Sequence, residues 1–261
     1  MAPKIDTLTR WTLELSLIVA VCATGLYACS NSAGNGYAPS TSQPALRSIH
    51  KQTFNYTGHK QTFVVPTGVT NIAVTASGAS GGVPYPDSTA GTGGLVRAEI
   101  SVTPGERLEI YVGGSGAGGG AGGYNGGGDG GVPYNSAALA AAGGGGASDV
   151  RQRGLKFADR VIVAGGGGGA PGDGGAKGAP GSIGTGGAGG SGFCNSAGGG
   201  AGGGYFGGGG GGGAGYCYSY SGGGGGGAGG SSYVEPGAMH VVDRRGAAPP
   251  GNGAIVITWK R

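Results

Sequence analysis

The sequence has few charged residues, few aromatic residues and few histidines, and each shortage excludes a class of protein. Only 11% of its residues are charged and 7% are aromatic, whereas an ordinary domain is about 25% charged. The three histidines, His50, His59 and His240, are isolated and lack the spacing of metal ligands. The sequence also has no credible nucleophile elbow, phosphate loop or dinucleotide-binding motif. We therefore expect no enzyme, no cofactor and no metal site.

The net charge is small, and it argues against nucleic acid as a partner. The formal charge is +4, and the basic residues are scattered rather than gathered in a stripe with interleaved aromatic residues. Nucleic-acid-binding surfaces show such a stripe.

Glycine is what the sequence has in excess, with 72 of the 261 residues. Only 13 residues are proline, and glycine does not recur at every third position throughout, so a collagen triple helix is not expected. Between residues 113 and 230, 56 residues are glycine, and nine of them keep a period of three from Gly166 to Gly190. Three residues per turn is the period of the polyproline-II helix. The tract is therefore either disordered or an ordered packing of polyglycine-II helices that pair their backbones.

Segments with alternating apolar residues flank and interrupt this tract. We expect strands within 53–77, at 94–102, 107–112, 148–151 and 160–164, and at 232–234, 239–242 and 254–259. No amphipathic helix is evident after the N-terminal region. The sequence thus predicts an all-β, jelly-roll-like sandwich over residues 53–261, with a glycine-rich insertion of packed polyglycine-II helices at about 113–230.

The first 28 residues have the pattern of a secretory signal peptide. Lys4 and Arg10 precede an uncharged apolar run at 15–28, which is shorter than the roughly 20 residues that a membrane-spanning helix needs. The run ends in Leu26-Tyr27-Ala28-Cys29, which resembles a bacterial lipobox and predicts Cys29 as a lipid attachment site. An ordinary signal peptide with an incidental cysteine is the alternative.

The residues after Cys29 fit an anchored protein. Residues 29–52 are rich in Ser, Asn, Gly and Pro and predict a flexible linker. Ser30 stands where an aspartate would indicate retention in the inner membrane. We therefore expect the bacterial cell envelope, with the outer membrane favoured and the membrane bound through the N-terminal lipid. Secretion is the alternative location.

Two cysteines remain beyond the leader, Cys194 and Cys217. In an exported chain an even pair suggests a disulfide, which would close a loop of mostly glycine. Free thiols are the alternative, while a metal site would lack further ligands.

Three segments together resemble a known family. They are FNYTGHKQTFVVPTGVTNIAVTASGASGG (54–82), GGGGASDVR (143–151) and RVIVAGGGGG (160–169). They resemble bacterial glycine-rich domain proteins and the extracellular glycine-rich region of the anaplastic lymphoma kinase and leukocyte tyrosine kinase receptors. The resemblance implies the sandwich with a polyglycine-II insertion. In the receptors this region recognises a protein ligand, but no kinase motif occurs in this sequence.

Aromatic residues punctuate the longest glycine runs. They form a candidate recognition patch for a surface protein or a glycan, made of Tyr205, Phe206, Tyr216, Tyr218 and Tyr220. The alternative is that they seal the packed helices. Asp149, in the segment GASDV, is expected to cap a turn or to pair with an arginine.

These features predict a non-enzymatic, lipid-anchored envelope protein with a structural or adhesive role. The alternative is a ligand-binding module similar to the receptor glycine-rich region.

Overall fold

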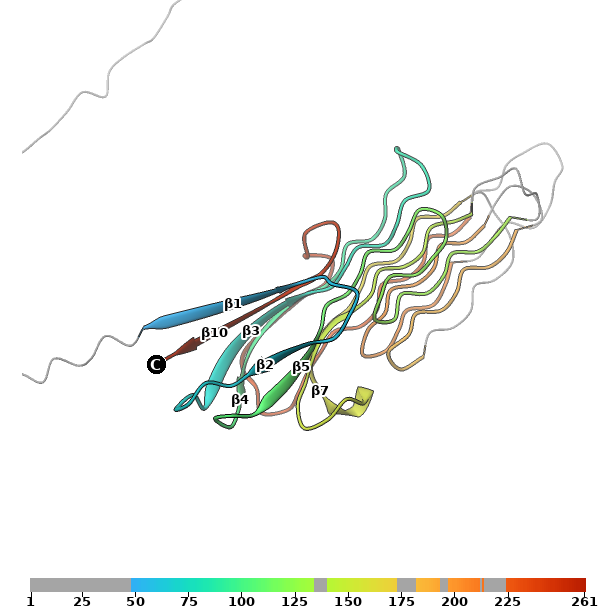
Figure 1. The fold of residues 1–261 in the computed structure, drawn as a ribbon. Coiled ribbons are helices and arrows are strands. Elements are labelled where there is room, and N and C mark those ends of the chain that lie inside the picture. The colour runs from blue at the N-terminus through green and yellow to red at the C-terminus, as the bar shows by residue number, and fades with distance from the viewer. Residues whose placement is uncertain (1–47, 134–139, 173–181, 193–196, 212, 214–223) are drawn as a thin grey trace, which may run out of the picture. The chain divides into compact units, whose positions relative to one another are not determined.

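Two five-stranded antiparallel sheets pack face to face as a β-sandwich (Figure 1). The computed structural model describes residues 48–133, 140–172, 182–192, 197–211, 213 and 224–261, within a compact unit that spans residues 46–261. The first sheet has the order β1 (Ile49–Asn55), β10 (Ala254–Lys260), β3 (Asn71–Ser77), β4 (Leu95–Ser101) and β9 (Met239–Arg244). The second has the order β2 (Gln61–Val64), β5 (Arg107–Tyr111), β6 (Ser148–Arg151), β7 (Arg160–Ala164) and β8 (Tyr233–Val234). The all-β sandwich expected from the sequence is confirmed.

The core lies between the sheets and follows the period of two that strands impose. In β3, Ile72, Val74 and Ala76 are buried while Asn71 is exposed and Ala73 and Thr75 are half-buried. The large buried side chains are branched aliphatic residues from both sheets, namely Ile72, Ile100, Leu108, Ile110, Ile162, Ile255 and Ile257. Alternation of this kind buries one face of each sheet and leaves the other free. One turn of 3-10 helix, η1 (Phe157–Asp159), connects β6 to β7.

Strand β1 begins earlier than the sequence predicted. Residues 29–52 were expected to be linker, but Ile49 is already paired with Lys260, and seven consecutive pairs join β1 to β10. The linker prediction is therefore wrong for 49–52. The reason lies in the edge position of β1, where Phe54 is the only fully buried side chain, so the alternation that marks an inner strand is weak.

Glycine-rich segments continue from the strands at one end of the sandwich (Figure 1). We call them the glycine array and define it as the described residues of 78–94, 113–133, 140–147, 165–172, 182–192, 197–211 and 224–231. The chain leaves β3, β5 and β7 into the array and returns from it into β4, β6 and β8. The array therefore includes 78–94, which lies outside the insertion expected at 113–230.

Backbone hydrogen bonds connect each array segment to several others with a period of three. The N–H groups of segment 141–147 donate to three neighbours in rotation, through the pairs Ala141–Gly131, Ala142–Ala170, Gly143–Ala117, Gly144–Gly128, Gly145–Gly167, Gly146–Gly114 and Ala147–Asn125. Its carbonyl groups accept from three further segments, through the donors Ala79, Gly82, Gly123, Gly200 and Gly203. This segment thus has six hydrogen-bonded neighbours, whereas a strand in a sheet has two.

The glycines with a period of three take part in this pattern. Gly166, Gly169 and Gly172 donate to Gly203, Gly200 and Ala197, and Gly184, Gly187 and Gly190 donate to Tyr205, Gly208 and Gly211. Gly175, Gly178 and Gly181 lie outside the described residues. Each described member therefore points its N–H group to the same side of its segment.

The segments approach so closely that most array positions exclude a side chain. A Cβ atom on Gly144 would lie 2.0 Å from the carbonyl oxygen of Ala201, and one on Gly166 would lie 2.1 Å from that of Gly145. Such contacts fall far inside van der Waals separation and involve backbone atoms that cannot move independently. A few positions are open, and a Cβ on Gly209 would meet no atom within 4 Å.

We expect Gly144→Ala to lower the free energy of unfolding by about 2–3 kcal/mol, because the methyl group forces two paired segments apart. Gly209→Ala is the matched control and should change it by less than about 0.5 kcal/mol. Thermal and denaturant unfolding followed by circular dichroism measure both. Equal stability of the two variants would contradict the close packing of the array.

Candidate functional site

Four strands of the second sheet each place one long side chain on the face turned away from the core. These side chains are Tyr111 of β5, Arg151 of β6, Arg160 of β7 and Tyr233 of β8. Phe157 of η1 and Tyr205 of the array join them. We call these six residues the arginine–aromatic ladder.

Guanidinium groups and aromatic rings alternate along the ladder. Cζ of Arg151 lies 3.7 Å from the ring centre of Tyr111 and 5.1 Å from that of Phe157. Cζ of Arg160 lies 4.6 Å from the ring centre of Phe157 and 5.4 Å from that of Tyr205. The ring of Tyr205 stacks on that of Tyr233, with centroids 4.1 Å apart. Cation–π contacts within about 6 Å are attractive and gain strength when water is excluded.

Asp149 neutralises Arg151 inside the ladder. Nε of Arg151 donates to Oδ1 of Asp149 at 2.7 Å, and both side chains are buried. Asn125, held at a positive φ of 66°, donates to Oδ2 of Asp149 at 2.8 Å and to the carbonyl of Ala147 at 2.7 Å. The expectation that Asp149 pairs with an arginine is confirmed.

Arg160 connects the sheet to the glycine array. Its guanidinium donates to the carbonyl oxygens of Phe157 at 3.0 Å, Gly204 at 3.0 Å and Tyr205 at 3.3 Å. Burial lowers the pKa of Arg160 below its usual range, while the negative charge of Asp149 opposes this effect. Carbonyl acceptors thus hold a buried cation that has no carboxylate of its own among the described residues.

The two arginines are direct cross-strand partners, a placement that normally repels. Arg151 pairs with Arg160 where the register of β6 and β7 shifts. Like charges in this position are destabilising. The ring of Phe157 contacts both guanidinium groups, and Asp149 supplies one compensating charge. The pair is therefore tolerated only within the complete ladder.

An exposed apolar patch borders the ladder. Leu155, Phe157, Ile183 and Phe206 are 54%, 41%, 58% and 56% exposed, and we call them the junction patch. Ile183 and Phe206 form an isolated antiparallel bridge. The ring of Phe157 lies against Gly184, where a Cβ atom would come within 2.7 Å of it. Contiguous apolar groups on a surface often mark an interaction site.

The structure describes two of the five aromatic residues predicted as a recognition patch. Tyr205 is half-buried in the ladder, which fits the sealing role, whereas Phe206 is exposed in the junction patch. Six predicted site residues lie outside the described residues, namely Cys29, Cys194, Tyr216, Cys217, Tyr218 and Tyr220. Sequence reasoning missed Phe157 and Ile183, because their neighbours come from distant or separate elements: Phe157 contacts Arg151 and Arg160, and Ile183 is bridged to Phe206.

The two guanidinium groups of the ladder are engaged by Asp149 and by backbone carbonyl oxygens. Within the described residues, no group of His, Cys, Asp and Glu side chains is placed to hold a metal ion. Burial raises the pKa of Tyr124, and the neighbouring Tyr111 adds to the effect, so its hydroxyl stays protonated at neutral pH. The ladder and the junction patch thus offer stacked aromatic rings and exposed apolar side chains for contact.

Asp149→Ala should lower the free energy of unfolding by about 3–5 kcal/mol, because it leaves the buried Arg151 without its counter-charge. The exposed Asp243 provides the control, and Asp243→Ala should cost less than about 0.5 kcal/mol. Chemical denaturation gives both values. A small loss for Asp149→Ala would contradict the structural role of the ion pair.

The role of the ladder is inferred from its geometry alone. No family model matches the chain, and no curated protein was found that is similar to it. Among the residues that the structure describes, no helix has the length and apolar character needed to cross a membrane.

Proposed function

We propose that this chain is a non-enzymatic protein of the bacterial cell envelope, anchored through a lipid on Cys29, with a structural or adhesive role. The observation that supports this most is the hydrogen bonding of the glycine array. A segment that is bonded to six neighbours cannot bend without breaking several bonds at once. The array is therefore suited to act as a stiff spacer rather than as a flexible tail.

The finer architecture belongs to the same proposal. The period-three donors and the close approach of the segments support a packing of polyglycine-II helices, in which seven residues extend about 22 Å. A jelly-roll-like course is supported by the pairing of the first and last strands and by the repeated crossing of the chain between the sheets.

The first described residue, Ser48, and the array lie at opposite ends of the sandwich. The carbonyl of Ser48 accepts a hydrogen bond from the N–H of Arg261 at the outer end of β1 and β10. At the other end of these strands, Asn55 pairs with Ala254, and Ala254 pairs with Ser77, the last residue before the array. The chain that connects to a lipid anchor before Ser48 would therefore reach the sandwich at the end without the array.

Cells that express the chain with a radiolabelled fatty acid should incorporate label into the protein. Cys29→Ala should abolish this incorporation, because the thiol that accepts the lipid is lost. Cys22→Ala, inside the apolar run, is the matched control and should retain the label. Label that persists in Cys29→Ala would refute the anchor.

A second candidate function is recognition of a protein partner by the junction patch. Aromatic and apolar anchors dominate the binding energy of protein interfaces. A glycan would need free polar groups beside the rings, whereas Arg151, Asp149 and Arg160 are engaged internally. Arg153 and Lys156 are exposed beside Leu155, which favours an apolar partner surface with acidic flanks. The resemblance to the ligand-binding receptor region points the same way.

Replacing Ile183 and Phe206 with serine should reduce the adhesion of cells that display the chain to protein-coated surfaces by at least about tenfold. Met239→Ser with Val241→Ser removes two similarly exposed apolar side chains from β9 and should leave adhesion unchanged. Thermal unfolding of both double variants checks that the fold is retained. Equal adhesion of the two would exclude the junction patch.

A further inference from the structure

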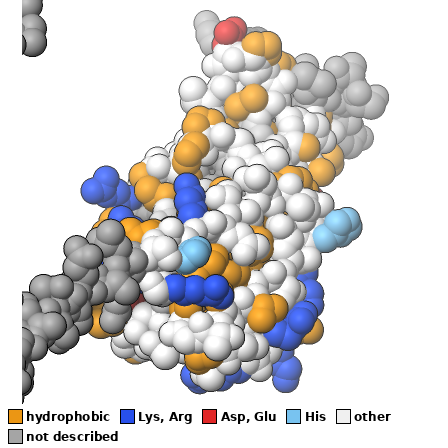
Figure 2. All heavy atoms as spheres, turned by 60° about the vertical axis from the view of Figure 1, so that its left-hand side comes forward, with side chains coloured by type: hydrophobic (Ala, Val, Ile, Leu, Met, Phe, Trp, Pro, Cys, Tyr) orange, Lys and Arg blue, Asp and Glu red, His pale blue; other side chains and the backbone are white. Residues whose placement is uncertain are grey.

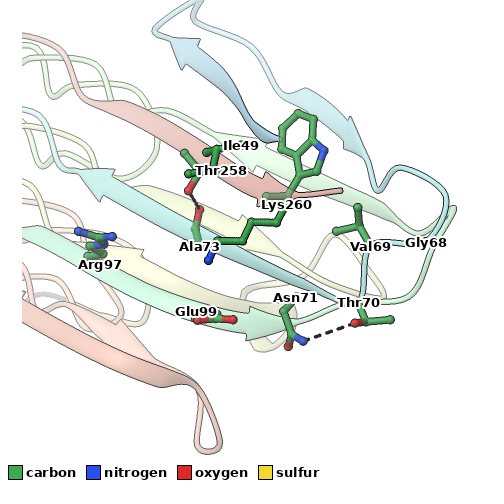
Figure 3. A pocket seen from close by; sticks show the side chains of 11 residues that line it. Ile49, Gly68, Val69, Thr70, Asn71, Ala73, Arg97, Glu99, Thr258 and Lys260 are labelled. Atoms are coloured by element: carbon green, nitrogen blue, oxygen red, sulfur yellow. Dashed lines mark hydrogen bonds between the residues drawn. The ribbon is translucent and has the colours of Figure 1, made fainter. Parts of the chain in front are cut away.

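A shallow groove of about 650 Å³ crosses the outer face of the first sheet near the end where the chain enters (Figure 3). Small side chains, Ala73 of β3 and Thr258 of β10, lie at its centre. Arg97 of β4 and Lys260 of β10 line it from two sides, and Ile49 of β1 lies at its border. A smaller hollow of about 300 Å³ continues the groove toward β9.

The cations of the groove are free to bind an external anion. Arg97 and Lys260 are exposed, and neither forms an ion pair within the described part of the chain. Glu99 also lines the groove, but its carboxylate lies 3.2 Å from Nδ1 of His240. The groove therefore presents two unpaired positive charges beside one carboxylate that already has a partner.

The charge imbalance extends over the whole described sandwich. Of the carboxylate side chains in residues 48–77, 95–112, 148–164 and 232–261, only Asp243 is exposed. The exposed cations in the same ranges are Lys51, Lys60, Arg97, Arg107, Arg153, Lys156, Arg244, Arg245, Lys260 and Arg261. Figure 2 shows Lys and Arg side chains spread over this part of the molecule. A surface of this kind attracts polyanions.

The short distance in sequence between the groove and the proposed lipid attachment site indicates which polyanion the groove would bind. Ile49 borders the groove, and only residues 30–47 separate Ser48 from Cys29. A linker of this length with the flexibility that its composition predicts would span roughly 25 Å. A lipid on Cys29 would thus hold the groove close to the bilayer at a high effective concentration. The nearest extended anion is then the layer of phosphate headgroups.

We propose that the outer face of the first sheet docks onto an anionic membrane, with lipid phosphates bound by Arg97 and Lys260. The inference rests on the proposed lipid anchor and adds a second membrane contact to it. A basic patch is a usual second membrane contact beside a lipid anchor. Each basic residue at an anionic surface strengthens binding by about fivefold.

The test uses the full chain carrying Cys29→Ser, so that no acyl chain contributes to binding. Sedimentation with vesicles of pure phosphatidylcholine is compared with sedimentation with vesicles of phosphatidylcholine and phosphatidylglycerol in equal parts. The apolar N-terminal segment binds to both kinds of vesicle, so the difference in affinity between them measures the contribution of charge. We expect tighter binding to the anionic vesicles, and this preference should fall steeply as salt is added.

Two matched double variants locate the surface. Arg97→Gln with Lys260→Gln should weaken binding to anionic vesicles by about 25-fold. Arg107→Gln with Arg153→Gln removes the same charge from β5 and from the loop after β6, and should weaken it by less than about threefold, because these residues belong to the second sheet, on the other side of the sandwich from the groove. Circular dichroism confirms that both variants are folded.

Equal loss in the two double variants, or equal binding to neutral and anionic vesicles, would overturn the proposal. Binding to dissolved dextran sulphate without binding to anionic vesicles would assign the cations to a polymer and would also overturn it. The acyl label at Cys29 distinguishes failure of the anchor proposal from failure of the docking proposal. Loss of label with retained vesicle preference refutes only the anchor, and retained label without preference refutes only the docking surface.

Discussion

An extended backbone without side chains can leave water only if neighbours satisfy every N–H and C=O group, and the glycine array depends on this requirement. Segment 141–147 meets it by bonding in rotation to six neighbours. Segments that bond in all directions must approach closely, and a Cβ atom at Gly144 would lie 2.0 Å from a neighbouring carbonyl oxygen. Glycine is therefore required by geometry at most of these positions. The entropy lost in ordering it is offset by hydrogen bonding and close packing rather than by a hydrophobic core.

The sandwich fixes the register of the glycine segments, which their identical residues cannot specify. The chain enters the array from the ends of β3, β5 and β7 and returns from it into β4, β6 and β8, so these strand ends fix where each array segment begins and ends. A register slip within Gly207–Gly213 would exchange identical residues, so side chains cannot specify it. The register must be imposed from the ends of the segments. Arg160 contributes by binding the carbonyls of Gly204 and Tyr205, which fixes the start of one array segment against β7.

The strands could be predicted from the sequence because their signals are local. Alternation in Asn71–Ser77 and the apolar run at 160–164 report burial directly, and Asp149 next to two arginines indicated an ion pair. The ladder could not be predicted, because Tyr111, Arg151, Arg160 and Tyr233 come from four strands whose order depends on topology. A usable signal was the presence of Arg151 and Arg160 beside fully apolar residues, since a buried arginine must have compensating partners. Strand β1 was missed at its start because its edge position buries few side chains.

The choice of arginine in the ladder follows from the shape of its side chain. A guanidinium donates in its own plane and leaves both faces free for aromatic rings, whereas an ammonium has no face. Arg160 uses the plane for three carbonyl acceptors and stays close to the rings of Phe157 and Tyr205. A lysine at this position would satisfy fewer carbonyls and would present no flat face to the ring of Phe157. The guanidinium group of Arg160 thus joins the sheet to the array through in-plane hydrogen bonds and through contacts of its faces with aromatic rings. The same two kinds of contact allow the positive charges of Arg151 and Arg160 to lie side by side where both are buried.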